Sequence, residues 1–125
     1  MKLRFFKCDH CGNEIMMVVD KGVPVICCGQ KMTELVPGTS DGAVEKHVPE
    51  VSVAGKNVDV VIGSVEHPMV EGHYIEWIAI ETTKGSQIKT LKPGDAPKAS
   101  FVLSEDEELV SVFEYCNLHG LWKKD

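Results

Sequence analysis

The chain has 125 residues, of which 43% are hydrophobic and 26% are charged, as in globular domains and unlike disordered chains. The longest apolar run, Ile15–Val19, is far shorter than the roughly 18 residues that a membrane span requires. The formal net charge of −6 disfavours nucleic acid as a partner, because nucleic-acid-binding proteins present a basic face. We therefore expect a globular protein whose partners include neither nucleic acid nor a membrane.

Cysteine usage indicates metal binding rather than disulfide pairing. The five cysteines are an odd number, which a fully paired disulfide framework does not use. The first residues, Met1–Phe6, lack the apolar stretch of a secretory signal, so we expect the protein in the reducing cytoplasm. Clustered thiols in that compartment usually bind metal.

Four of the cysteines form two pairs near the start of the chain, and a glycine follows each pair. The residues are Cys8, Cys11 and Gly12, and then Cys27, Cys28 and Gly29. The glycines suit tight turns around thiolates, which often require a positive φ. Two such turns on a hairpin can present four thiolates to one tetrahedral ion.

The segment between the two pairs is predicted to form that hairpin, with strands at Ile15–Val19 and Val23–Ile26 around a turn at residues 20–22. Tetrahedral sulfur ligation suits both zinc and iron, although adjacent cysteines are unlike the usual zinc pattern of two CxxC motifs. A disulfide between vicinal Cys27 and Cys28 would be strained. Because about 36 residues are too few to fold on an apolar core alone, the metal should contribute to folding here.

Beyond residue 38 the pattern changes to short β-type runs. We interpret Thr39–Ala43 as a linker or turn, and no stretch shows the 3.6-residue period of a helix. The predicted strands are Val58–Ile62, Tyr74–Thr83, Ser86–Leu91, Ala99–Leu103 and Leu109–Tyr115. Short strands separated by turn signals predict an antiparallel sandwich.

Four histidines fall in the gaps of this strand pattern, and the fifth cysteine lies where the last predicted strand ends. The set is His47, His67, His73, Cys116 and His119. A single loop histidine is usually a solvated side chain, but four of them with one thiol form a candidate metal site. The fifth histidine, His10, lies inside the CxxC motif, and we interpret it as a surface residue.

Five protein ligands exceed the usual number for zinc, whereas imidazole suits iron and one sulfur ligand tunes its electronic properties. An iron ion with five protein ligands keeps one open position. We expect chemistry to occur at that position.

Together, six motifs resemble the desulfoferrodoxin family of two-iron superoxide reductases, and the resemblance covers essentially the whole chain. The motifs are Cys8–Gly12, Cys27–Gly29, Glu45–Pro49, Gly63–Met69, Leu91–Pro97 and Glu114–Gly120. The resemblance implies a mostly β protein with two domains, usually dimeric. Residues 1–37 would form a desulforedoxin-like iron domain, and residues 38–125 an immunoglobulin-like antiparallel β-sandwich with the catalytic iron.

The resemblance also implies two iron ions per chain. The first would be held by Cys8, Cys11, Cys27 and Cys28, with zinc as a possible substitute. The second would be held by His47, His67, His73 and His119 in the equatorial plane, with Cys116 as the axial ligand.

The implied reaction is the one-electron reduction of superoxide to hydrogen peroxide, which consumes two protons and detoxifies superoxide. Lys46 would attract the anion, and Glu45 would bind ferric iron when no substrate is present. By composition alone, these neighbours are an ordinary surface pair. A rubredoxin-like protein would supply the electrons.

Two other readings of the residues are a rubredoxin-like electron carrier and a zinc-stabilised binding module. Neither needs five further ligands in an open site, so the set around Cys116 separates them from a superoxide reductase.

Overall fold

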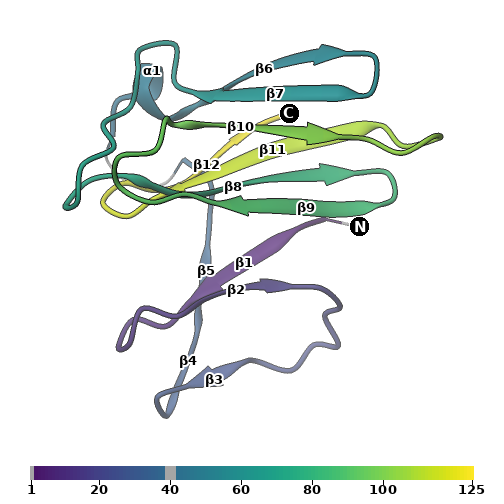
Figure 1. The fold of residues 1–125 in the computed structure, drawn as a ribbon. Helices are drawn as coiled ribbons and strands as arrows, with labels where there is room; N and C mark the ends of the chain where they lie inside the picture. Colours follow the sequence, from purple (N-terminus) through teal and green to yellow (C-terminus); the bar gives the residue numbers. More distant parts are fainter. Residues whose placement is uncertain (1, 39–41) are drawn as a thin grey trace. The chain divides into compact units, whose positions relative to one another are not determined.

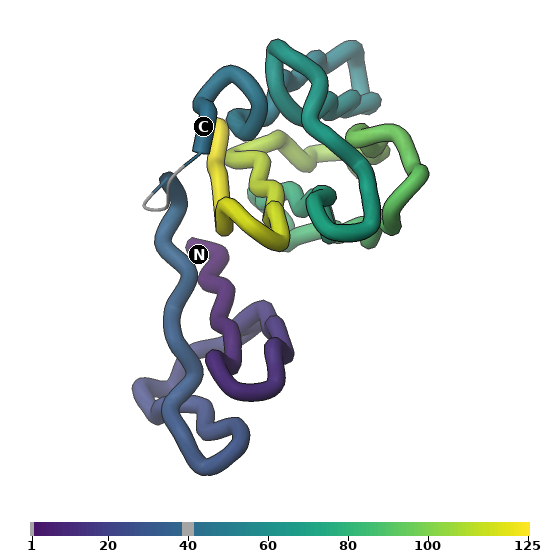
Figure 2. The backbone as a smooth tube through the Cα atoms, turned by 90° about the vertical axis from the view of Figure 1, so that its left-hand side faces the viewer, coloured from purple at the N-terminus to yellow at the C-terminus, as the bar shows by residue number. Residues whose placement is uncertain are grey.

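The structure, a computed structural model, describes residues 2–38 and 42–125. It is formed mainly by antiparallel strands (Figure 1). The chain divides into two compact units, Met1–Val36 and Pro37–Asp125, which Figure 2 traces in purple to blue and in blue to yellow. Three residues of the predicted linker, Thr39–Asp41, lie outside the described residues.

The smaller unit contains a three-stranded antiparallel sheet in the order β2-β1-β5, formed by β1 (Arg4–Lys7), β2 (Glu14–Met17) and β5 (Thr33–Leu35). A two-stranded hairpin of β3 (Ile26–Cys27) and β4 (Gln30–Lys31) completes it. The predicted hairpin of Ile15–Val19 with Val23–Ile26 was wrong, since β2 pairs with β1, and β3 begins only at Ile26 and pairs with β4. Pro24 has no N–H to donate to a strand ladder, which explains the late start.

The larger unit is a sandwich of two antiparallel sheets with strand orders β10-β7-β6 and β12-β11-β8-β9. Seven strands in sheets of three and four are the architecture of immunoglobulin-like domains. The strands are β6 (Pro49–Ala54), β7 (Asn57–Ile62), β8 (Ile75–Thr82), β9 (Gly85–Thr90), β10 (Lys98–Val102), β11 (Leu109–Cys116) and β12 (Gly120–Lys124).

The core lies between the two sheets. In β7, every second residue is buried, so Val58, Val60 and Ile62 face inward while the residues between them face water. They pack in one cluster with Ile78 and Ile80 of β8, among other residues of the facing sheet. The alternation of β7 and the runs of β-branched and aromatic residues in its neighbours are why the sequence located β7 to β11 within one residue at each end.

The prediction missed β1, β4 and β5 of the smaller unit, and β6, β12 and the short helix α1 (Val44–His47) of the larger one. Only four residues form α1, so it has no room to show a helical period. The segments that carry the four histidines and Cys116 gather at one end of the sandwich: α1, the β7–β8 connection and the β11–β12 turn (Figure 1). Among the described residues, no helix is long and apolar enough to span a membrane.

Candidate metal centres

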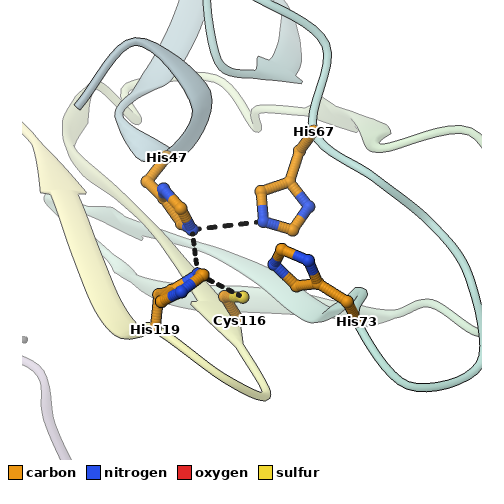
Figure 3. Close-up of side chains that lie close together, drawn as sticks. All are labelled: His47, His67, His73, Cys116 and His119. Atoms are coloured by element: carbon orange, nitrogen blue, oxygen red, sulfur yellow. Dashed lines mark hydrogen bonds between the residues drawn. The ribbon is translucent and has the colours of Figure 1, made fainter. Parts of the chain in front are cut away.

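Five potential ligands lie together at that end of the sandwich (Figure 3). His47 ends α1, His67 and His73 lie in the β7–β8 connection, Cys116 ends β11, and His119 lies in the β11–β12 turn. Each side chain offers one ligand atom, and these atoms all lie within 4.8 Å of one another. The fold therefore brings together the five residues that the sequence singled out.

The four imidazoles form a closed ring in which each is nearly perpendicular to the next. Centroid distances are 4.7 Å from His47 to His67, 4.7 Å from His67 to His73, 5.0 Å from His73 to His119 and 4.9 Å from His119 back to His47. The planes of neighbouring rings meet at 78° to 90°. Such an arrangement directs four ring nitrogens toward a common centre, as Figure 3 shows.

Nitrogen–nitrogen distances inside the ring identify the inward-facing atoms. Nε2 of His47 lies 3.2 Å from Nε2 of His67 and 3.1 Å from Nδ1 of His119. The other nitrogens of His47 and His67 lie 2.7 Å from the carbonyl oxygens of Ala43 and Pro68. An Nδ1–H that donates to a carbonyl leaves Nε2 with a free lone pair, which is the ligand form of histidine.

His73 supplies an independent indication that this group binds a metal. Its Nε2 atom is buried and has no hydrogen-bond partner among the described residues. Buried polar atoms without a partner are costly, so an unpaired nitrogen beside three other imidazoles fits a metal ligand.

Desolvation keeps three of the imidazoles, those of His47, His67 and His73, neutral. Desolvation lowers the pKa of His47 and His73, and it lowers the pKa of His67 to about 4. The three rings are therefore ready to donate lone pairs at neutral pH rather than to carry protons.

The thiol of Cys116, unlike the imidazoles, must lose a proton before it can bind a metal as a thiolate. Its sulfur lies 3.8 Å from Nδ1 of His119, and the residue is fully buried. Desolvation raises the pKa of this thiol, so the thiolate needs a nearby positive charge in order to form. A metal cation held by the four imidazoles would supply that charge. The donor set thus fits a metal ion with four nitrogen ligands and one sulfur ligand.

The smaller unit holds the second group, formed by Cys8, Cys11, Cys27 and Cys28, whose sulfur atoms also lie within 4.8 Å of one another. The sulfurs of Cys11 and Cys27 are 3.6 Å apart. All five cysteines of the chain are free thiols, and the glycines after the two pairs have the predicted positive φ, 85° at Gly12 and 74° at Gly29.

Backbone amides in this group point at sulfur. The N–H groups of Cys11 and Asn13 donate to the sulfurs of Cys8 and Cys11, each at 3.4 Å. The hydrogen bond from the Cys11 amide is the main reason that the pKa of Cys8 falls to about 6. Hydrogen bonding with the side chain of Cys11 instead raises the pKa of Cys28 to about 12, so four thiolates can coexist only around a cation. His10 is exposed and outside the group, as predicted.

Glu45 and Lys46 are both exposed on α1, directly before His47. The carboxylate of Glu45 is not part of the group around Cys116. The carbonyl oxygen of Glu45 accepts hydrogen bonds from the Val65 amide at 2.9 Å and from the Ser64 hydroxyl at 3.3 Å. The charge of Lys46 adds a smaller contribution to the desolvation that lowers the pKa of His47 and His73, so this charge acts on the site.

Sequence reasoning missed two residues beside the Cys116 group. Trp122 stacks on His47, and Glu114 is fully buried in β11, where neither carboxylate oxygen has a hydrogen-bond partner among the described residues. The alternation of β11, which places residues 114 and 116 on one face, was a signal for Glu114. The contact between Trp122 and His47 spans 75 positions, and no local pattern predicts it.

Comparisons with known proteins agree with this geometry. A family model described as desulfoferrodoxin matches residues 39–125. The chain is 48% identical to the desulfoferrodoxin of Nitratidesulfovibrio vulgaris over 120 residues, which cover 96% of this chain and 94% of the relative.

Among solved structures, the superoxide reductase of Treponema pallidum matches with a TM-score of 0.84 and 36% identity, over 99% of this chain and 98% of that one. A superoxide reductase of Giardia intestinalis, described as 1Fe-SOR, matches with a TM-score of 0.55 and 35% identity, over 64% of this chain and 95% of that one. From its sequence matches over nearly its whole length and from the two ligand groups that its fold assembles, this chain belongs to the desulfoferrodoxin family.

Proposed function

We propose that this protein is a superoxide reductase, which detoxifies superoxide by one-electron reduction to hydrogen peroxide at a ferrous iron. The observation that carries the proposal is the closed ring of four imidazoles with the thiol of Cys116 beside it. The similarity to the superoxide reductase of Treponema pallidum over nearly the whole chain supports it.

Iron is the metal that best suits this donor set. Four nitrogens and one sulfur exceed the usual number of protein ligands for zinc, and mixed imidazole and thiolate ligation suits iron. When bound, iron supplies the single electron that, with two protons, converts superoxide to hydrogen peroxide. An iron ion held by these five residues would keep one position open for the substrate.

The residues of the chain set the conditions for that chemistry. The carbonyls of Ala43 and Pro68 fix the orientation and the tautomer of two imidazoles, so these rings need no rearrangement to bind a metal. The buried thiol of Cys116 gives up its proton only when a cation offsets the negative charge. The site is therefore built for a cation and places one anionic donor against it.

Lys46 and Glu45 are the proposed catalytic residues. The substrate is an anion and the chain carries a formal charge of −6, so the distant charges of the protein repel it. Screening at physiological salt weakens charges beyond about 8–10 Å, and the local attraction of Lys46 then dominates. In this proposal Glu45, its neighbour on α1, would be the residue that holds ferric iron when no substrate is present.

The first centre is proposed to hold a second iron ion on Cys8, Cys11, Cys27 and Cys28, with zinc as a possible substitute. Family membership further suggests a rubredoxin-like electron donor, a homodimer and a cytoplasmic location. Five free thiols are compatible with a reducing compartment.

The two alternatives fit the chain less well. A rubredoxin-like electron carrier needs only the four cysteines, and a zinc-stabilised binding module needs only one closed site. Neither accounts for four imidazoles whose nitrogens converge at distances of 3.1 and 3.2 Å, with a buried thiol beside them.

The test combines metal analysis with product stoichiometry. We expect two irons per chain, or one iron and one zinc if zinc has replaced iron on the four cysteines. The reduced protein, mixed rapidly with superoxide, should form one peroxide per superoxide, whereas dismutation forms one per two. No iron on the histidine site after anaerobic loading with ferrous ion, or a ratio of one to two, would reject the proposal.

A further inference from the structure

Trp122, in β12, contacts two of the four imidazole residues at once. Its indole stacks on the ring of His47, with centroids 4.9 Å apart and an angle of 26° between the planes. Its Nε1–H donates a hydrogen bond of 3.0 Å to the carbonyl oxygen of His119. The residue is only 6% exposed. One rigid side chain therefore contacts the imidazole face of His47 and the backbone of His119.

Gly42 lies against the same three residues from another side. A Cβ atom added at Gly42 would lie 3.1 Å from Cβ of His119, 3.1 Å from Cζ2 of Trp122 and 3.2 Å from Cε1 of His47. Real Cβ contacts are rarely this short, so at least one of the three side chains would have to shift. The φ of Gly42 lies outside the left-handed region, so the need for glycine comes from space and not from backbone conformation.

These contacts restrict the tilt of the His47 ring, which the hydrogen bonds of the imidazoles do not. The Ala43 carbonyl holds His47 at Nδ1, which fixes one edge of the ring but still allows the ring to tilt about that bond. The indole of Trp122 lies along one face of the His47 ring, and Gly42 approaches its Cε1 atom. His119 lies in the β11–β12 turn, where the indole N–H holds its carbonyl.

We propose that Trp122 and Gly42 are positioning residues that together fix the angle between the imidazoles of His47 and His119, and through it the geometry of the metal centre. This inference rests on the metal site of the proposed function but not on the superoxide chemistry. Trp122 acts by contact with both residues, and Gly42 acts by leaving the space in which the stack fits.

The chain offers a matched control for Gly42. Gly72 lies in the β7–β8 connection next to His73, its φ is also outside the left-handed region, and an added Cβ there would meet nothing within 4 Å. The variants Gly42→Ala and Gly72→Ala thus add the same methyl group beside a histidine of the site, one into contact and the other into open space. The variant Trp122→Phe keeps an aromatic ring on His47 but removes the N–H donor to His119.

The experiment compares the three variants with the parent after loading with ferrous iron. We measure iron content, the rate of iron loss to a chelator, the visible absorption band of the oxidised site, its reduction potential and the melting temperature. Residues that orient metal ligands typically alter metal affinity about 10- to 100-fold. We therefore expect Gly42→Ala and Trp122→Phe to lose iron from this site about tenfold faster or more and to shift the absorption band. Gly72→Ala should behave like the parent.

If Trp122 and Gly42 only stabilised the fold, their substitution would lower the melting temperature but would leave the absorption band and the reduction potential of the iron unchanged. A shift of the band or of the potential therefore identifies a role in positioning the ligands. If Gly42→Ala does not fold, Trp122→Phe carries the test. Parent-like chelation rates and absorption in the folded variants would overturn the inference. A parent that binds iron at this site but does not reduce superoxide would overturn the proposed function alone, since none of these measurements depends on turnover.

Discussion

The sulfur of Cys116 lies 3.8 Å from Nδ1 of His119, and the two residues are held three positions apart by the end of β11 and the turn that follows it. The thiol is fully buried, and burial raises its pKa. Cys116 is thus the one potential anionic ligand among five, and it ionises only when a metal occupies the site.

Replacing Cys116 by serine should abolish turnover even where iron stays bound to the four imidazoles. A serine hydroxyl does not ionise at this site, so the variant loses both the negative charge and the electron donation of sulfur. We expect a loss of superoxide reduction of at least about 100-fold, the upper range for changes around a metal site. Pulse radiolysis measures the rate and metal analysis the iron content. A serine variant that works near the parent rate would refute the role of the thiolate.

Lys46→Ala should slow the second-order reaction with superoxide about tenfold or more, because local charge raises association rates by about 10- to 1,000-fold. Glu45→Ala, on the same helix turn, is the control and should leave this step nearly unchanged. Added salt should slow the parent and should slow Lys46→Ala less or even speed it. Rate constants measured by pulse radiolysis across ionic strengths test this, and equal salt slopes for parent and Lys46→Ala would show that the lysine is only a surface charge.

Gly63 is predicted to position the backbone of Glu45 and Lys46, because it has no side chain and this backbone can pack closely against it. Its φ is +83°, and an added Cβ would clash with the Val65 carbonyl oxygen and would lie 2.7 Å from that of Glu45. Gly63→Ala should therefore destabilise the protein by more than the about 1–2 kcal/mol of left-handed strain and should also slow superoxide reduction.

Gly55 provides the control for Gly63, because its φ is +61° but an added Cβ would meet nothing within 4 Å. Gly55→Ala should lower the free energy of unfolding by about 1–2 kcal/mol and leave the rate with superoxide unchanged. Denaturant unfolding and pulse radiolysis measure the two quantities. If the two substitutions changed the free energy of unfolding equally and the rate with superoxide equally, the predicted role of Gly63 would be contradicted.

The first centre should be dispensable for the chemistry of the second. The two groups share no residue, so Cys8→Ser removes one of four sulfur ligands and leaves the group around Cys116 complete. With a chemical reductant as electron source, superoxide reduction should stay within about twofold of the parent, since separate sites usually behave independently. Loss of most activity while the second iron remains bound would show that the first centre takes part.

The sequence predicted the composition of both ligand groups, because thiols and imidazoles at strand ends and turns carry their own signal. Nine side chains singled out by type and spacing do meet as two groups in the fold. The alternation of β7 and the β-branched runs of its neighbours located five strands of the sandwich. Such local patterns predict strands reliably, because they reflect the burial of one face of each strand.

Contacts that arise only from packing could not be predicted in this way. β6 begins at Pro49 and its buried pattern is weak, so its partners in the fold decide that it is a strand. Trp122 contacts His47 because β12 pairs with the end of β11. A side chain at position 42 is disfavoured because three other side chains lie close to it. Each of these depends on residues distant in the chain, on which a local pattern carries no information.

Glu114 makes the stability of the protein depend on pH. Burial raises the pKa of its carboxyl group to about 9 in the folded protein, against an ordinary value of 4.5. Between those two values the folded state holds a proton that the unfolded state releases, so the free energy of unfolding falls as pH rises. The contribution is complete below about pH 4.5, falls by about 1.4 kcal/mol per pH unit and levels off above about pH 9.

Glu114→Gln should remove this slope, because glutamine has a similar shape and does not ionise. Its free energy of unfolding should vary less with pH than that of the parent, and the advantage of the variant should grow from pH 5 to pH 9. Glu50→Gln, at an exposed position of β6, controls for the loss of one negative charge. Denaturant unfolding of the three proteins at equal iron content, in steps of one pH unit, measures the slopes. Parallel curves for the parent and Glu114→Gln would mean that this carboxyl is ionised inside the folded protein.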